Sequence, residues 1–270
     1  MIKFVTDMFS PEEADVIVFG IPLGDKSEIT LQNLRKVSRL VEPFDLEKRK
    51  NLLEGIKISD LGDYSSTTPT DILKNVKRFV DNKKIPLALG GQHTLTLFTT
   101  GELPAGTKII IFDAHCDAKD SYMNSKFNHA TWFRRAIEAK GADSFVLVGV
   151  RSCEEDEMDF LEKNNVKYFT SKQIKNEMEK VKQELKEFVK DSPVYISIDM
   201  DVFDPSIAPA VEYCEPDGIF YHHFVELISE IGSNLIGMDV VEIRSHVENR
   251  ITEFLAIKSI FQILGNVKRV

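Results

Sequence analysis

Cysteine is scarce in this chain of 270 residues, which contains only Cys116, Cys153 and Cys214. An odd and scattered set of this kind does not predict a disulfide framework. No two of the cysteines have the Cys-x-x-Cys spacing that is typical of a zinc site. We therefore expect a fold without a disulfide framework, and no thiolate metal centre.

A leader sequence and long apolar runs are also lacking. The first 16 residues, "MIKFVTDMFSPEEADV", have neither the basic start nor the long apolar stretch of a signal peptide. No segment approaches the roughly 20 apolar residues that a membrane helix needs. These absences predict a soluble cytoplasmic protein without a membrane partner.

Basic residues are in deficit, with 34 Lys and Arg against 43 Asp and Glu and a net charge of -9. This balance disfavours nucleic acid as a partner, because its phosphates would be repelled. It would suit a cationic substrate. Pro- or Gly-rich linkers, low-complexity segments and internal repeats are missing as well, so we expect residues 1–270 to form a single domain.

What the sequence does contain is a series of short aliphatic runs separated by helical patterns. Most runs are continuous rather than alternating, which indicates strands covered on both faces. The clearest helix is predicted at residues 171–191, with Ser171 as its cap, and others at 68–82 and 250–264. This alternation predicts a three-layer α/β fold with a mainly parallel sheet. The runs lie at residues 15–20, 85–91, 108–115, 144–150, 166–170, 193–204 and 235–243.

Acidic and histidine side chains directly follow four of these runs. In a parallel sheet, sites form beyond the carboxyl ends of the strands, so we expect these side chains to meet. Side chains alternate along a strand, so residues two apart would share a face if the backbone stays extended. The residues are His93, Asp113, His115, Asp117, Asp199, Asp201 and Glu242.

Taken singly, these residues have ordinary explanations. His93 alone would be a core or helix-start residue, and an Asp-x-Asp pair would be a loop or capping pair. Together, the carboxylates would repel one another, and some would have to take up protons. Divalent cations remove this repulsion. Mixed Asp and His ligands suit Mn²⁺, with Zn²⁺, Fe²⁺ or Co²⁺ as alternatives.

With these motifs in place, the chain resembles the ureohydrolase family of arginases, agmatinases and formiminoglutamases. The motifs are "GGQHT" (90–94), "DAHCD" (113–117), "SIDMDVFDPSIAP" (197–209) and the late Glu242. The resemblance implies an α/β/α sandwich around an eight-stranded parallel sheet and a homo-oligomer, often a trimer or hexamer. It also implies two Mn²⁺ ions that activate a water molecule against a guanidinium carbon. One ion would be held by His93, Asp113, Asp117 and Asp199, and the other by His115, Asp113, Asp199 and Asp201.

The resemblance further implies roles for three residues outside the ligand set. In "SKFNHATWFRRAIE" (125–138), His129 would shuttle a proton to the departing amine. Glu242 would bind the guanidinium and Glu154 the far end of the substrate. Each has an alternative: His129 as a surface or capping residue, Glu242 as a salt-bridge partner of a nearby arginine, and Glu154 as a helix amino-terminal acid. The predicted catalytic residues are His129, Asp117 and Glu242.

The expected reaction is the hydrolysis of agmatine to putrescine and urea. The alternatives are another ureohydrolase specificity (arginine, guanidinobutyrate, formiminoglutamate or aminopropylagmatine), phosphoester hydrolysis, or a non-catalytic metal-binding role. The chain departs from the family pattern at Gln92, where an acid is usual, and in the segments 20–40 and 211–218. Both segments are expected near the substrate mouth or subunit contacts, so they bear on substrate identity.

Overall fold

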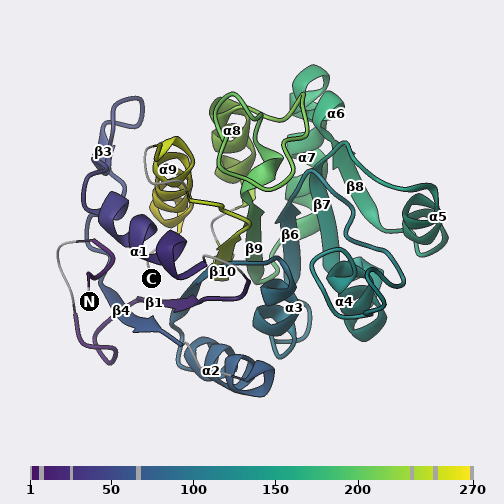
Figure 1. Ribbon diagram of the computed structural model, residues 1–270. Coiled ribbons are helices and arrows are strands. Elements are labelled where there is room, and N and C mark those ends of the chain that lie inside the picture. Colours follow the sequence, from purple (N-terminus) through teal and green to yellow (C-terminus); the bar gives the residue numbers. More distant parts are fainter. Residues whose placement is uncertain are drawn as a thin grey trace.

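Eight parallel strands form the centre of the molecule (Figure 1). The computed structural model describes residues 2–5, 9–24, 27–64, 68–231, 234–245 and 249–267. A separate antiparallel pair joins β2 (Phe44–Asp45) to β3 (Lys50–Asn51). In spatial order, the strands of the main sheet are β4 (Ile58–Asp63), β1 (Val16–Ile21), β5 (Ile85–Gly90), β10 (Leu235–Val241), β9 (Val194–Asp199), β6 (Lys108–Phe112), β7 (Phe145–Val150) and β8 (Lys167–Thr170).

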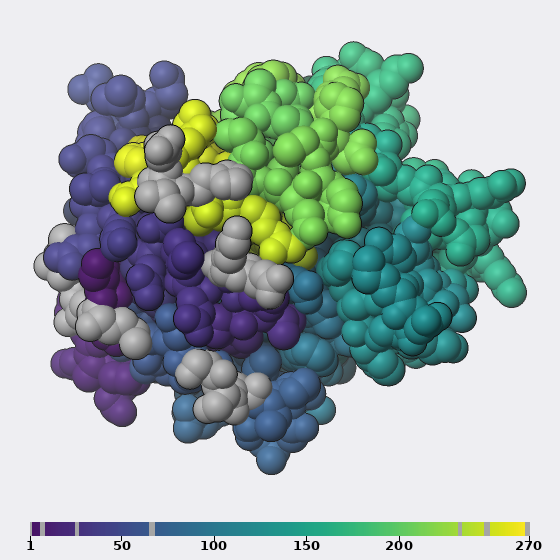
Figure 2. Space-filling view, viewed as in Figure 1, coloured from purple at the N-terminus to yellow at the C-terminus, as the bar shows by residue number. Residues whose placement is uncertain are grey.

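Helices cover both faces of this sheet, as Figure 1 shows. One layer contains α1 (Ser27–Ser38), α6 (Ser171–Asn176), α7 (Met178–Val189), α8 (Tyr221–Ile231) and α9 (Ile251–Asn266). The other contains α2 (Pro69–Asp81), α3 (Thr94–Thr100), α4 (Trp132–Lys140) and α5 (Glu155–Lys163). Short 3-10 turns lie at Ala142–Ser144 (η1) and Met200–Val202 (η2). In Figure 2, α9 reaches the surface as a yellow band between indigo and green segments, consistent with its contacts to α1 and α8.

The continuous aliphatic runs are explained by this layering. In β1, Val16 and Val18 belong to the core under the α9 layer, whereas Ile17 and Phe19 belong to the core under the α2 layer. Side chains alternate across a strand, so a strand buried on both faces needs apolar residues at every position. The predicted three-layer α/β fold with an eight-stranded parallel sheet is therefore confirmed.

Two details of the predicted elements were wrong. The strand β4 was missed because its sequence, Ile58-Ser-Asp-Leu-Gly-Asp63, carries polar residues; Arg35 of α1 pairs there with both Asp60 and Asp63. The single helix predicted at 171–191 is two helices, because the backbone breaks at Glu177 (φ -133°, ψ 37°). The first of them is capped by Thr170 rather than Ser171.

The helix predicted at 68–82 corresponds to α2, which begins after Thr68. The hydroxyl of Thr68 accepts a hydrogen bond from the Asp71 amide, and the Asp71 carboxylate accepts one from the Thr68 amide. This reciprocal arrangement is a capping box, and Pro69 occupies the first helical position, where its missing N–H costs nothing. Within the described ranges, none of the helices has the length and apolarity to cross a bilayer.

Candidate metal centre

The polar residues of interest lie where four neighbouring strands end. The sheet order places β5, β10, β9 and β6 side by side, so their carboxyl ends form one continuous edge. His93 follows β5 directly before α3, Asp113 follows β6, Asp199 ends β9, and Glu242 follows β10. Parallel strands thus bring together residues that are up to 149 positions apart in the chain.

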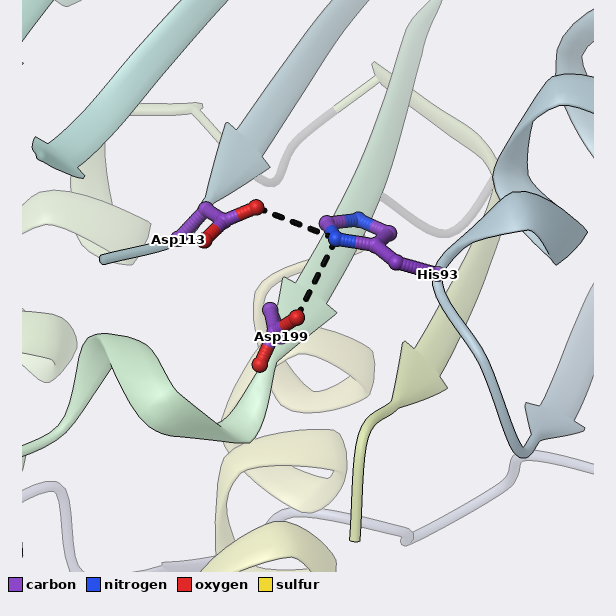
Figure 3. A group of neighbouring side chains, drawn as sticks. All are labelled: His93, Asp113 and Asp199. Carbon is purple, nitrogen blue, oxygen red and sulfur yellow. Dashed lines mark ion pairs between the residues drawn. The ribbon is translucent and has the colours of Figure 1, made fainter. Parts of the chain in front are cut away.

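The first cluster is the His93 triad, formed by His93, Asp113 and Asp199 (Figure 3). The imidazole Nδ1 of His93 lies 3.0 Å from Asp113 Oδ2 and 3.1 Å from Asp199 Oδ2. Asp117 Oδ2 lies 3.5 Å from the same nitrogen. All three members of the triad are buried. Three carboxylates therefore converge on one nitrogen in a site shielded from solvent.

The second cluster is the His115 triad, formed by His115, Asp113 and Asp201. His115 Nδ1 lies 2.9 Å from Asp201 Oδ2 and 3.6 Å from Asp113 Oδ1. The two oxygens of Asp113 thus face different histidines, and Asp113 belongs to both triads. One carboxylate shared between two ligand groups is the arrangement expected where two cations lie close together.

The side chains converge, but not by the predicted alternation along extended strands. The strand β6 ends at Phe112, and Asp117 has a left-handed backbone (φ 49°). After Asp199 the chain enters η2, and the Asp201 amide donates to Asp199 Oδ1 at 2.9 Å. Glu242 is also left-handed (φ 58°). Such conformations are costly for residues other than glycine and cluster at functional sites, where the surrounding structure enforces them.

Electrostatics make the His93 triad a site that attracts positive charge. Burial opposes protonation of His93, but the nearby carboxylates of Asp113, Asp117 and Asp199 outweigh it and raise the pKa of the imidazole well above its ordinary value. Burial, followed by the charges of Asp201 and Asp113, raises the pKa of Asp199 well above its ordinary value. The cluster therefore favours a compensating positive charge beside its carboxylates.

The pKa values of His115, in the second triad, and of Glu242, which follows β10, are also raised. Burial opposes protonation of His115, yet hydrogen bonds to Asp113 and Asp201 raise its pKa to about 12. Burial raises the pKa of the Glu242 carboxyl to about 7. The shift at His115 thus comes from its two neighbouring acids, and the shift at Glu242 comes mainly from burial.

Two buried atoms of this centre test whether the residues fit a metal. His93 Nδ1 and Asp113 Oδ2 are fully buried, and neither makes a hydrogen bond of acceptable geometry with any described residue. Buried polar atoms are nearly always satisfied, so such orphans indicate a missing partner. An imidazole lone pair and a carboxylate oxygen 3.0 Å apart are suitable donors to one divalent cation. The donor set fits.

Neighbouring groups hold the carboxylates in place. The indole of Trp132 donates to Asp117 Oδ2 at 2.8 Å, and its ring packs on that of His93 at 4.5 Å. The Ala114 amide donates to Asp201 Oδ1 at 3.1 Å. Metal ligands commonly need such outer contacts to fix their orientation. Trp132 was not predicted as a site residue, although a lone tryptophan within the predicted shuttle segment 125–138 was a usable signal.

A pocket of about 310 Å³ opens above the two triads. His129 and Glu242 line it, together with Lys119, Tyr122 and Glu154. The His129 ring meets that of Tyr122 edge-on at 5.6 Å. The volume lies at the small end of the range typical of ligand sites. The structure thus places all three predicted substrate-side residues around one pocket.

Glu242 and Glu154 have partners in the structure that bear on the alternatives raised for them. Glu242 Oε1 accepts a hydrogen bond of 2.7 Å from the His93 amide, whereas Arg244 pairs with Glu212. Glu154 directly precedes α5 and pairs with Lys119. The helix-start position expected for Glu154 as an alternative is therefore observed, alongside its place in the pocket wall.

The unusual segment 211–218 contributes to the pocket through Glu212, Tyr213 and Glu215. The Tyr213 ring packs edge-on against His115 at 5.9 Å, and Glu215 Oε1 lies 3.8 Å from His115 Nε2. The guanidinium of Arg151 anchors this segment, donating to the carbonyls of Glu215 and Pro216. Arg151 also donates a hydrogen bond of 2.6 Å to the carbonyl of Asp201, so it connects the pocket wall to the His115 triad.

The cysteine prediction was wrong in one respect: Cys116 and Cys153 form a disulfide bond, while Cys214 is free and exposed. The two residues are 37 positions apart, but β6 and β7 are neighbours, and the loops after them bring the Cα atoms within 5.5 Å. Their spacing in the sequence carried no sign of this proximity. The bond joins the "DAHCD" segment to the segment that holds Ser152 and Glu154.

Comparison with known proteins identifies the family to which this chain belongs. The profile described as "Arginase family" matches residues 14–265. A Methanothermus fervidus protein described as "Uncharacterized 32.2 kDa protein in hmfB 3'region" is 34% identical over 87% of this chain and 84% of its own. An agmatinase from Pyrococcus horikoshii is 26% identical over 94% of this chain and 92% of its own.

A solved structure is similar over nearly the same extent. The agmatine ureohydrolase of Thermoplasma volcanium superimposes with a TM-score of 0.83 and 31% identity, covering 96% of this chain and 92% of that one. The shared fold agrees with the eight-stranded parallel sheet, and the family match spans almost the whole sequence. The chain belongs to the arginase family of hydrolases.

Proposed function

We propose that the protein is a binuclear metal amidinohydrolase that converts agmatine and water to putrescine and urea, with two Mn²⁺ ions as its cofactor. The observation that carries the proposal is the pair of triads at adjoining strand ends, which share Asp113. The agmatinase relative and the structural likeness to an agmatine ureohydrolase support the choice of substrate.

In this proposal the six predicted ligands divide between two ions. Bound there, the ions would lower the pKa of a coordinated water so that it attacks at neutral pH. The protein's own contribution is to present the ligands on rigid strand ends and to shield them from bulk solvent. One ion would be held by His93, Asp113, Asp117 and Asp199, and the other by His115, Asp113, Asp199 and Asp201.

Glu242 is proposed to bind the guanidinium group. Its carboxylate lines the pocket beside the metal triads, and one of its oxygens is held by the His93 amide at 2.7 Å. A carboxylate and a guanidinium form a planar pair with two parallel hydrogen bonds, which would orient the reacting carbon toward the triads. The cationic substrate would also favour the ionised form of an acid whose pKa is raised to about 7.

His129 is proposed to deliver a proton to the departing amine. It stands half-buried in the pocket wall, and its ring is set by the edge-on contact with Tyr122. A protonated imidazole can give up a proton as the C–N bond breaks and recover one from solvent. Glu154 is proposed to meet the amine at the far end of agmatine once Lys119 releases its carboxylate.

The test is product release from purified protein loaded with Mn²⁺. Agmatine, arginine, guanidinobutyrate and aminopropylagmatine are tested by measuring the urea they release. Formiminoglutamate is tested by measuring formamide. We expect urea from agmatine at the highest kcat/KM. Turnover of arginine but not agmatine would refute the substrate, and no product from any compound despite two bound ions would favour a non-catalytic role.

The remaining proposals concern assembly and location. We propose a cytoplasmic homo-oligomer, a trimer or hexamer, on the strength of the family resemblance. Light scattering coupled to size-exclusion chromatography would determine the number of subunits. A mass of one chain, about 30.7 kDa, would contradict the proposed assembly.

A further inference from the structure

Beneath the metal triads lies a buried carboxylate that the proposed chemistry does not use. Asp239, in the middle of β10, is fully buried. Four hydroxyl groups donate hydrogen bonds to it, two from the neighbouring strand β9 and two from helix α3. They belong to Ser197 (2.6 Å), Tyr195 (2.7 Å), Thr99 (2.8 Å) and Thr96 (3.1 Å).

One of these hydroxyls links Asp239 to the metal centre. Ser197 Oγ lies 3.1 Å from His93 Nε2, the imidazole nitrogen opposite the one that faces Asp113 and Asp199. With Nδ1 turned toward the carboxylates, Nε2 is free to donate its proton to Ser197. Ser197 in turn donates to Asp239, which completes a line from carboxylate to hydroxyl to imidazole.

A purely structural role explains this arrangement poorly. A carboxylate inside a core is costly, and an apolar residue of similar size would usually stabilise the fold better. Within the described part of the chain, the hydrogen bonds to the Asp239 carboxylate come from hydroxyl groups rather than from a cation. Ser197 links this buried network to His93.

We infer that Asp239 is a positioning residue for the metal centre, acting through Ser197 to hold His93 with its proton on Nε2 and its Nδ1 lone pair toward the ligand carboxylates. The inference rests on the proposed metal centre. Histidine ligands commonly donate their second N–H to a carboxylate, either directly or through another group, and this contact fixes both tautomer and ring orientation. Here the contact is relayed by a serine from the neighbouring strand.

The test measures Mn²⁺ binding by calorimetry in the wild type, Ser197→Ala, Asp239→Asn and the double variant. His93 belongs to one triad only, so we expect one of the two binding steps to weaken about 10- to 100-fold while the other is unchanged. Because both residues act along one line, the double variant should bind about as weakly as the weaker single variant. The matched control is Thr100→Val, a buried threonine of α3 whose hydroxyl donates to the Thr96 carbonyl.

The outcomes separate the inference from the proposed function. If the wild type binds no Mn²⁺, the metal centre itself is refuted. If the wild type binds two ions and the variants match it within twofold, or weaken both steps equally with a lower melting temperature, the inference is overturned. Additive losses in the double variant also contradict it. Should Asp239→Asn not fold, Ser197→Ala decides the question, since it leaves Asp239 three hydroxyl partners.

Discussion

The floor of the pocket and its outer wall are built from different kinds of backbone. The floor consists of the two triads and Asp117, held at the ends of central strands, and its aspartates 113, 199 and 201 are at most 5% exposed. The outer wall lies on irregular segments and is half-buried or exposed; it consists of Lys119, Tyr122, His129, Glu154, Glu212, Tyr213 and Glu215. We infer that the floor sets the chemistry and the wall sets the substrate.

The largest effect is expected from breaking the floor at the carboxylate that both triads share. Asp113→Asn should lose both ions and lower kcat/KM on the order of 10³-fold or more, since the activated water depends on them. Metal content by elemental analysis and urea release check this. The control is Asp120→Asn, an exposed acid of the same segment that pairs with Arg135. Normal metal content in Asp113→Asn would contradict the ligand assignment.

On the outer wall, His129→Ala should lower kcat by roughly 10²- to 10³-fold, the usual contribution of a positioned proton donor. Its metal content should stay at the wild-type level, because His129 belongs to the wall and not to the floor. The exposed His222 supplies a control, His222→Ala, with unchanged turnover. Loss of metal in His129→Ala would mean that His129 is a ligand instead.

The disulfide joins floor to wall, so breaking it tests how far the two are coupled. Cys153→Ser should lower the free energy of unfolding by about 2–4 kcal/mol, because it releases a loop of 37 residues. Urea denaturation without reductant measures this, with Cys214→Ser as the control. The native, unreduced protein should show one reactive thiol per chain. Three reactive thiols, or a Cys153→Ser variant as stable as wild type, would exclude the bond.

The smallest effect is expected at the rim of the wall, where Lys119 neutralises Glu154. Lys119→Ala should free that carboxylate for the substrate amine and lower KM for agmatine roughly two- to fivefold, the scale of an exposed ion pair. We expect kcat to stay the same. Steady-state kinetics with Lys126→Ala as the control check this. A higher KM would show that Lys119 itself supports binding.

This contrast also explains how much could be predicted from the sequence. The doubly covered strands and the residues at their ends were predictable, because apolar runs and strand-end acids follow simple rules of parallel sheets. The strand β4 was not predicted because it contains Asp60 and Asp63. These acids form ion pairs with Arg35 that only the fold reveals. The backbone turn at Asp117 likewise had no signature in the sequence.

The contacts behind the ligands were the least predictable part. Asp239 and Ser197 sit inside strands that read as ordinary core, and only the register between β9 and β10 brings them opposite each other. The bond between Cys116 and Cys153 depends in the same way on strand order. Pairings of this kind join distant segments, so local sequence patterns do not carry them.

The most direct test of the central claim is a crystal structure of the protein grown with Mn²⁺, with anomalous diffraction data collected at the manganese edge. We predict two anomalous peaks roughly 3.5–4 Å apart, one at each triad, with Asp113 contacting both. Anomalous density absent from both triads, with His93 and His115 bonded to their carboxylates alone, would contradict the account.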